Sequence, residues 1–275
     1  MPFIPSLLLA VSLVFSTPIM AQAKNAAEAD PVTWLQSHSS QSRVILLGEK
    51  HGTREIPRFV AAFIRAQPEA DALTLGLEVW RSEQTSLDAF LDADDGSAAG
   101  AALRESPFWR VSNDQHDGRR SEDMLELIDA VRQLRQAGRD INLLAYDLAP
   151  QTAHDHHSRD RMMADTLRAE FVAHPERRLL VLTGNVHAMQ EKPGYAPPEM
   201  QQPMGSYLAD LKPLAVNIEA SRGEFWGCRG SCGPIQIGNS SATSRVEQGH
   251  PYDLRLVLPE FSVARLLGRP APDPN

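Results

Sequence analysis

Six short apolar runs recur along the chain, separated by segments whose apolar residues fall at helical spacing. Each run is five to seven residues long and rich in Leu, Ile and Val. Such nearly continuous apolar runs are typical of strands buried on both faces, as in parallel sheets. The sequence therefore predicts an α/β fold with a mostly parallel central sheet flanked by helices. The predicted strands are residues 43–47, 73–79, 141–146, 178–183, 214–218 and 254–258.

The intervening segments predict the helices that connect these strands. The clearest begins at Ser121, a good N-cap residue, carries two acidic residues in its first turn and stops at Gly138. Between about 92 and 120 the periodicity fades, which indicates an excursion or lid with some short helix. The other predicted helices are residues 54–66, 82–91, 158–173 and 204–211.

The amino-terminal 23 residues carry no charged side chain and include a short apolar stretch from Leu7 to Phe15. Ala21 and Ala23 fit the small-residue positions before a signal-peptidase cut, and the stretch is shorter than the ~20 residues of a spanning helix. We therefore expect a signal peptide over 1–23, cleaved after Ala23, and a periplasmic or secreted protein without a membrane span. A linker and N-terminal segment (24–42), a single domain (43–268) and a flexible tail (269–275) follow.

The overall charge and the cysteines limit the partners. The 275-residue chain has 27 basic and 35 acidic residues, a formal charge of −8, which argues against nucleic acid and anionic membranes. We expect a small-molecule or peptide substrate instead.

The two cysteines, Cys228 and Cys232, lie in a Gly-rich stretch where an oxidising compartment favours a small disulfide loop. Two cysteines alone make a poor zinc site.

Polar residues follow four of the predicted strands at once. Parallel strands bring their carboxyl ends to one edge of a sheet, where ligands bind. The segments that meet there are Gly48-Glu49-Lys50-His51, Glu78, Asp147, and Gly184-Asn185-Val186-His187. Because burying a charge such as Glu78 is costly without a partner, this placement indicates a site.

We predict that Glu49, His51, Glu78 and His187 form the catalytic set. An imidazole can serve as a general base or bind a metal, and a neighbouring carboxylate can orient it. His51, Glu78 and His187 are also the candidate ligands of a divalent metal. Each residue alone has a structural alternative, such as Glu78 pairing with Arg54 or Arg81. Predicted substrate-binding residues are Arg161, Asp147, Asn185, Gly48 and Gly184.

Two further groups have competing interpretations. His154, His156 and His157 could bind a metal or haem, although a solvated loop before a helix explains them better. Trp80, Phe108 and Trp109 could line a pocket or belong to the core. The sequence contains no Gly-x-Ser-x-Gly elbow, Walker loop, dinucleotide fingerprint or His-Glu-x-x-His motif, so direct activation of water is the favoured chemistry.

The strand-end motifs resemble those of a known superfamily. The segments at 46–51, 77–78, 159–164 and 183–188 are similar, in order and spacing, to the erythromycin esterase-like and ChaN-like superfamily, which includes the Tiki and TraB/PrgY proteins. The resemblance covers roughly 43–220 and implies an α/β fold with the Glu and His residues in a central cleft. The chain is shorter than the macrolide esterases and lacks the cysteine of the ChaN-like lipoproteins.

The resemblance implies two different functions. Esterase members open a macrolide lactone with activated water and Tiki members resemble metal-dependent proteases, which favours an exported hydrolase with or without a divalent metal. ChaN-like members are envelope proteins linked to haem and iron, so the alternative is a haem- or iron-binding protein without hydrolytic activity. A member that has kept the fold and lost activity ranks last, because the motifs are intact.

Overall fold

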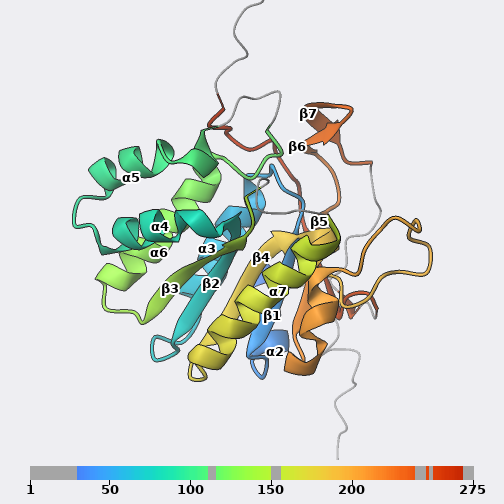
Figure 1. Ribbon diagram of the computed structural model, residues 1–275, viewed down its shortest axis with the longest axis horizontal. Coiled ribbons are helices and arrows are strands. Elements are labelled where there is room, and N and C mark those ends of the chain that lie inside the picture. Colours follow the sequence, from blue (N-terminus) through green and yellow to red (C-terminus); the bar gives the residue numbers. More distant parts are fainter. Residues whose placement is uncertain (1–29, 111–115, 150–155, 239–245, 248–249, 269–275) are drawn as a thin grey trace, which may run out of the picture.

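The computed structural model describes residues 30–110, 116–149, 156–238, 246–247 and 250–268, without the side chains of 156–158 and 246–247. A seven-stranded sheet in the order β3-β2-β4-β1-β5-β9-β8 forms its centre (Figure 1). Six of the strands are parallel and only the short β8 runs antiparallel, as the sequence predicts. The strands are β1 (Val44–Glu49), β2 (Leu73–Trp80), β3 (Ile141–Asp147), β4 (Arg178–Gly184), β5 (Leu214–Ala220), β8 (Val246–Glu247) and β9 (Leu254–Leu258).

Helices cover both faces of the sheet. On one face, α7 (His156–Ala173) and the 3-10 helix η4 (Met204–Leu211) pack on Leu46, Val181 and their neighbours. On the other face, the larger core joins Ile45 and Leu180 to helices that precede or follow β1 to β3. These helices are α2 (Pro31–Ser39), α3 (Glu55–Arg65), α4 (Gln84–Asp92), α5 (Gly96–Arg104) and α6 (Glu122–Gln136). Alternate residues of each strand thus enter two different cores.

The predicted helices are confirmed, with shifts of a few residues at their ends. Ser121 caps α6 by accepting a hydrogen bond from the Met124 amide, and the segment 92–120 carries α5 and the short helix η2 (Pro107–Trp109). Helix α2 lies in a segment that we expected to be a linker and N-terminal extension. Only three of its nine residues, Trp34, Leu35 and Ser39, are buried, and its sequence shows no clear apolar face that would have predicted a helix.

The sequence did not predict the antiparallel hairpin of β6 (Glu224–Arg229) and β7 (Ser231–Gln236). Gly and Cys interrupt its apolar pattern, so no strand signal stands out. The hairpin lies apart from the main sheet, at the top of Figure 1. The predicted disulfide is confirmed and joins Cys228 to Cys232 across it. In the described part of the chain, no helix is long and apolar enough to span a membrane.

Candidate active site

The four polar strand ends belong to four adjacent strands, β3, β2, β4 and β1. The carboxyl ends of these strands lie level with one another. Glu49 pairs with Gly184 across β1 and β4, and Leu77 pairs with Leu182 across β2 and β4. The helical turn α8 (Asn185–Ala188) starts directly where β4 ends and carries His187. The sheet order therefore brings together all four catalytic candidates.

Glu78 lies at the centre of this site and is 6% exposed. Its Oε2 atom accepts hydrogen bonds from the Thr183 hydroxyl (3.0 Å) and the Gly184 amide (2.7 Å). Its Oε1 atom accepts from Arg119 (3.1 Å) and Arg159 (2.7 Å). The partners are thus neither Arg54 nor Arg81, and they supply the compensation that a buried carboxylate needs.

His51 is oriented by two carboxylates. Its Nδ1 atom lies 2.9 Å from Oε1 of Glu49, and its Nε2 atom lies 3.7 Å from Oε2 of Glu78. Because a carboxylate accepts, Nδ1 carries the proton and Nε2 keeps its lone pair. Among the described residues, no hydrogen bond reaches Nε2 of His51, which is therefore available to a water molecule.

His187 has a second carboxylate partner that the sequence did not single out. Its Nδ1 atom lies 2.6 Å from Oδ1 of Asp160, which also accepts from the Met204 amide at 2.7 Å. Its Nε2 atom lies 3.0 Å from an Arg159 nitrogen and 3.8 Å from Oε1 of Glu78. The guanidinium donates, so the lone pair of His187 is already engaged.

Gly184 is the point where the two imidazoles meet. A Cβ atom added to Gly184 would lie 3.0 Å from Nε2 of His51, 3.4 Å from Cδ2 of His187 and 3.5 Å from Oε2 of Glu78. Only a residue without a side chain leaves this space open. His51, His187 and Glu78 therefore converge on one small space, as the strand-end argument predicts.

Arg119 is a site residue that the sequence analysis missed. One of its terminal nitrogens contacts Glu78 at 3.1 Å and Asp147 at 2.8 Å, and the rest of the guanidinium binds Asp117. Arg119 lies in the 92–120 segment, where the periodic pattern that places residues is absent. The clue in the sequence was that Glu78 and Asp147 are acidic residues at the ends of buried strands, where each needs a cationic partner.

Arg159, and not Arg161, is the arginine of α7 that enters the site. Arg159 bonds to both oxygens of Asp147 at 2.8 and 2.9 Å as well as to Glu78 and His187. Two residues along a helix rotate a side chain by about 200°, so Arg161 points away from the site, and it is exposed. Of this Arg-Asp-Arg segment, the structure brings Arg159 to the site and leaves Arg161, the residue predicted to bind substrate, at the surface.

Three other residues that we predicted to bind substrate, Asp147, Gly48 and Asn185, make contacts within the protein. Asp147 is 1% exposed and its carboxylate is held by the two arginines, so it supports them. Gly48 lets α8 approach β1, because an added Cβ would lie 3.0 Å from Cβ of Ala188. Asn185 is half-buried, and its carbonyl accepts from the Tyr252 hydroxyl at 2.7 Å.

Two groups of residues remain for which the sequence left competing interpretations, the aromatic residues and the second histidine group. Phe108 and Trp109 are buried at 0% and 2% exposure, so they belong to the core, whereas Trp80 is half-buried beside Phe108. Of the second histidine group, His154 lies outside the described residues and the side chains of His156 and His157 are not described.

The charges of the site shift the pKa values of its central groups in opposite directions. Burial alone would raise the pKa of Glu78, but His187, His51, Arg119 and Arg159 hold it well below the ordinary 4.5. Burial alone would lower the pKa of His51, but Glu78 and Glu49 outweigh it and raise the pKa above 6.5. Glu78 is therefore ionised, and His51 holds a proton more strongly than a free imidazole does.

The predicted metal ligands do not suit a divalent cation. Both oxygens of Glu78 are occupied by donors, and the lone pair of His187 faces the positive charge of Arg159. Two guanidinium groups beside the same carboxylate repel a cation. Across the described ranges, no group of three or more His, Cys, Asp or Glu side chains is arranged to hold a metal ion.

Comparison with solved structures identifies the fold. A histidine-to-asparagine mutant of erythromycin esterase EreC in its open conformation superposes with a TM-score of 0.56 at 13% identity, covering 74% of this chain and 78% of that chain. The chain has the erythromycin esterase-like fold. A succinoglycan biosynthesis protein matches with a TM-score of 0.63 at 10% identity (90% and 100% covered). A Bacillus cereus protein matches with a TM-score of 0.54 at 10% identity (87% and 94% covered).

Sequence comparison adds no relative to these structural matches. No protein-family model matches the chain, and no curated protein matches it. At identities of 10 to 13%, the likeness concerns the fold alone.

Proposed function

We propose that the protein is an exported hydrolase in which His51 activates water for attack on an ester, lactone or amide carbonyl. The observation that carries the proposal is the state of the His51 ring. Glu49 fixes the proton on Nδ1, while Nε2 lies beside Gly184 and receives no hydrogen bond from the described residues. In its neutral form the imidazole has a free lone pair on Nε2, and its raised pKa makes this nitrogen a stronger base.

His51 fits the role of general base better than His187. Arg159 donates to Nε2 of His187, so this nitrogen must lose a hydrogen bond before it can take a proton. A proton on His187 would also face the positive guanidinium at 3.0 Å. His187 is better suited to orient water or substrate, with Asp160 holding its ring.

The reaction needs no covalent intermediate with the protein. Nε2 of His51 takes a proton from water while the water oxygen bonds to the carbonyl carbon and the C=O electron pair moves to oxygen. The tetrahedral intermediate then collapses, the bond to the leaving group breaks, and the His51 imidazolium returns the proton to that group. Glu49 stabilises the imidazolium between these two steps, because its carboxylate accepts from Nδ1 at 2.9 Å.

Arg159 takes the place that we first assigned to Arg161. Its Nε and one terminal nitrogen are bound to carboxylates, whereas the other terminal nitrogen, among the residues that the structure describes, contacts His187 alone. That N–H lies 3.0 Å from Nε2 of His187 and can turn to a developing oxyanion. Glu78 and Asp147 hold the guanidinium in place for this role.

Export is the second part of the proposal. A disulfide is rare in proteins of a reducing compartment, and Cys228 and Cys232 are joined. The expected signal peptide, 1–23, lies outside the described residues. Amino-terminal sequencing of the protein recovered from a periplasmic fraction tests the predicted cut after Ala23.

A matched pair of histidine variants tests the catalytic assignment. The substrate panel is p-nitrophenyl acetate and butyrate, erythromycin, and a casein-derived peptide mixture. We expect His51→Asn to lose turnover by at least about 100-fold. The control is His174→Asn, whose residue lies 45% exposed at the end of α7 and pairs with Glu170.

Equal turnover in His51→Asn and the parent protein would refute the assignment. If no substrate of the panel is turned over, a haem titration decides between hydrolase and binder. A Soret shift that His51→Asn and His187→Asn abolish would replace the proposed hydrolase with a haem-binding protein.

A further inference from the structure

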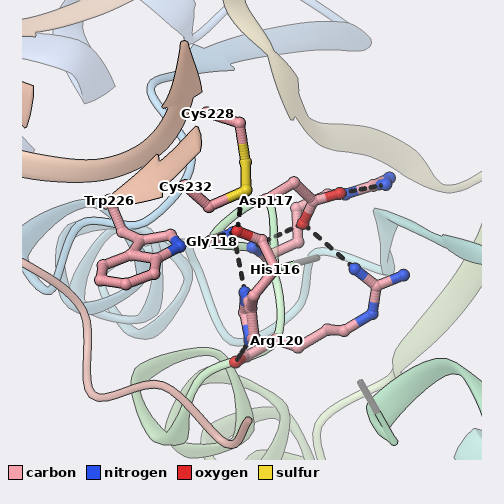
Figure 2. Close-up of a disulfide and its surroundings, with 8 residues drawn as sticks. His116, Asp117, Gly118, Arg120, Trp226, Cys228 and Cys232 are labelled. Carbon is pink, nitrogen blue, oxygen red and sulfur yellow. Dashed lines mark hydrogen bonds and ion pairs between the residues drawn. A yellow bond between two sulfur atoms is a disulfide. The ribbon is translucent and has the colours of Figure 1, made fainter. Parts of the chain in front are cut away.

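The disulfide-closed hairpin of β6 and β7 is packed against two segments of the candidate active site. Figure 2 shows the disulfide together with Trp226 and the turn that carries His116, Asp117, Gly118 and Arg120. Neither the hairpin nor this turn belongs to the main sheet. Their contact therefore requires an explanation beyond the packing of the core.

The first segment that the hairpin contacts follows His51. The Trp226 amide donates to the Gly52 carbonyl at 3.0 Å, and the Ala264 amide donates to the same oxygen at 2.9 Å. Gly52 has a φ of +75°, and an added Cβ would lie 2.3 Å from the Trp226 carbonyl oxygen. The backbone directly after His51 is therefore fixed by the backbone of β6.

The second segment precedes Arg119. The Trp226 indole N–H donates to the His116 carbonyl at 2.7 Å. His116 is fully buried, accepts from the Gly118 amide at 2.9 Å through Nδ1, and contacts the Arg120 carbonyl through Nε2. Burial lowers the pKa of His116, so the ring is neutral and closes the turn.

The two segments also touch each other beneath Trp226. An added Cβ on Gly118, whose φ is +94°, would lie 2.6 Å from Cα of Gly52 and 3.0 Å from the Trp226 carbonyl oxygen. Three backbones thus meet with no side chain between them. Gly52 is next to His51 and Gly118 is next to Arg119, so a shift of Trp226 moves both.

We infer that Trp226 is a positioning residue that holds His51 and Arg119 in register on either side of Glu78, with the disulfide keeping its hairpin closed. The inference rests on the proposed role of His51 as general base. The indole contributes a single N–H bond to a buried carbonyl, and its backbone contributes the bond to Gly52. Removal of the indole N–H takes away the side-chain hydrogen bond between the hairpin and the 116–120 turn, while the hairpin pairing remains.

The test is Trp226→Phe, which keeps a ring and removes the N–H donor. The charged groups that face His51 are Glu49, Glu78 and, from the turn, Asp117 and Arg119. As the turn moves, we expect the His51 titration midpoint, followed by NMR of the full-length protein, to shift by about 0.5 pH unit or more. We expect kcat to fall about tenfold with little change in KM, because misplacement affects the reacting geometry.

Gln236→Leu is the matched control, because it removes a hairpin hydrogen bond to Glu224 that touches neither site segment. It should change neither the His51 midpoint nor kcat. Far-UV circular dichroism and the melting temperature verify folding of each variant. If Trp226→Phe does not fold, the double variant Cys228→Ser with Cys232→Ser takes its place, with a smaller shift expected.

The NMR readout separates this inference from the proposed function. A shifted His51 midpoint in a protein that turns over no substrate supports the positioning role while the proposed hydrolase fails. An unchanged His51 midpoint in the folded variant overturns the positioning role, whether or not turnover changes.

Discussion

The Glu49 carboxylate accepts a hydrogen bond from the imidazole of His51 at 2.9 Å, although the two residues are only two positions apart. Glu49 is the last residue of β1, and the chain turns at Gly52 directly after His51. The strand end therefore presents a carboxylate and an imidazole as one unit. This unit fixes the tautomer of His51 before any substrate is present.

Replacement of Glu49 by Gln should alter the pH dependence of activity. Glu78 and Glu49 raise the pKa of His51 against the effect of burial, and a general base must be neutral to act. In the parent protein, kcat/KM should rise with pH through a midpoint above 6.5. Glu49→Gln should move this midpoint downward and lower its plateau by about tenfold. A midpoint that stays in place would show that Glu49 does not govern the ionisation of His51.

Glu78 should dominate the acid sensitivity of stability. Its folded pKa lies well below 4.5, so its contribution is fully present above pH 4.5 and is lost as the pH falls through the folded pKa. Glu78→Gln should lower the free energy of unfolding at pH 7 by about 3 kcal/mol, because two buried arginines lose a partner. Urea unfolding at pH 7 and pH 3 should show a smaller acid loss in the variant. An equal loss in both proteins would assign the acid sensitivity to other groups.

The sequence predicts the sheet and the convergence of the strand ends because both depend on local patterns. Buried parallel strands give apolar runs, and the residue after each run falls at a known edge. Arg119, Asp160 and Trp226 could not be found this way, because each reaches the site from a loop, a helix or a hairpin. Their positions depend on tertiary packing that no local pattern encodes.

The sequence alone also could not decide which of Arg159 and Arg161 enters the site, and a pair of substitutions tests the placement that the structure gives. Arg159→Lys keeps the charge but cannot bridge Asp147, Glu78 and His187 together. We expect it to lower the free energy of unfolding by about 2 kcal/mol and kcat by at least about tenfold. Arg161→Lys, on the opposite side of α7, should match the parent protein in urea unfolding and in turnover. Equal effects of the two substitutions would contradict the placement of Arg159.

Asp160 should matter through His187 and not through stability alone. Its carboxylate bonds to Nδ1 of His187 and to the Met204 amide. Asp160→Asn retains an acceptor for only one of these donors, so the His187 ring loses the carboxylate that orients it. We expect kcat to fall about tenfold while the melting temperature changes little. The exposed Asp165 on the same helix provides the control, and a loss of activity in Asp165→Asn would point to helix packing instead.

Gly184→Ala tests whether the space between the two imidazoles is where water reacts. The backbone of Gly184 has a φ of −53°, which alanine adopts without strain, so the variant should fold. Its methyl carbon would lie 3.0 Å from Nε2 of His51 and so block the lone pair that is proposed to take the proton. We expect kcat to fall by at least about 100-fold. Gly194→Ala adds a methyl group with no atom within 4 Å and should behave as the parent protein. If Gly184→Ala remains fully active with the His51 titration unchanged, the reacting water must lie elsewhere, and His51 loses its assignment as the base.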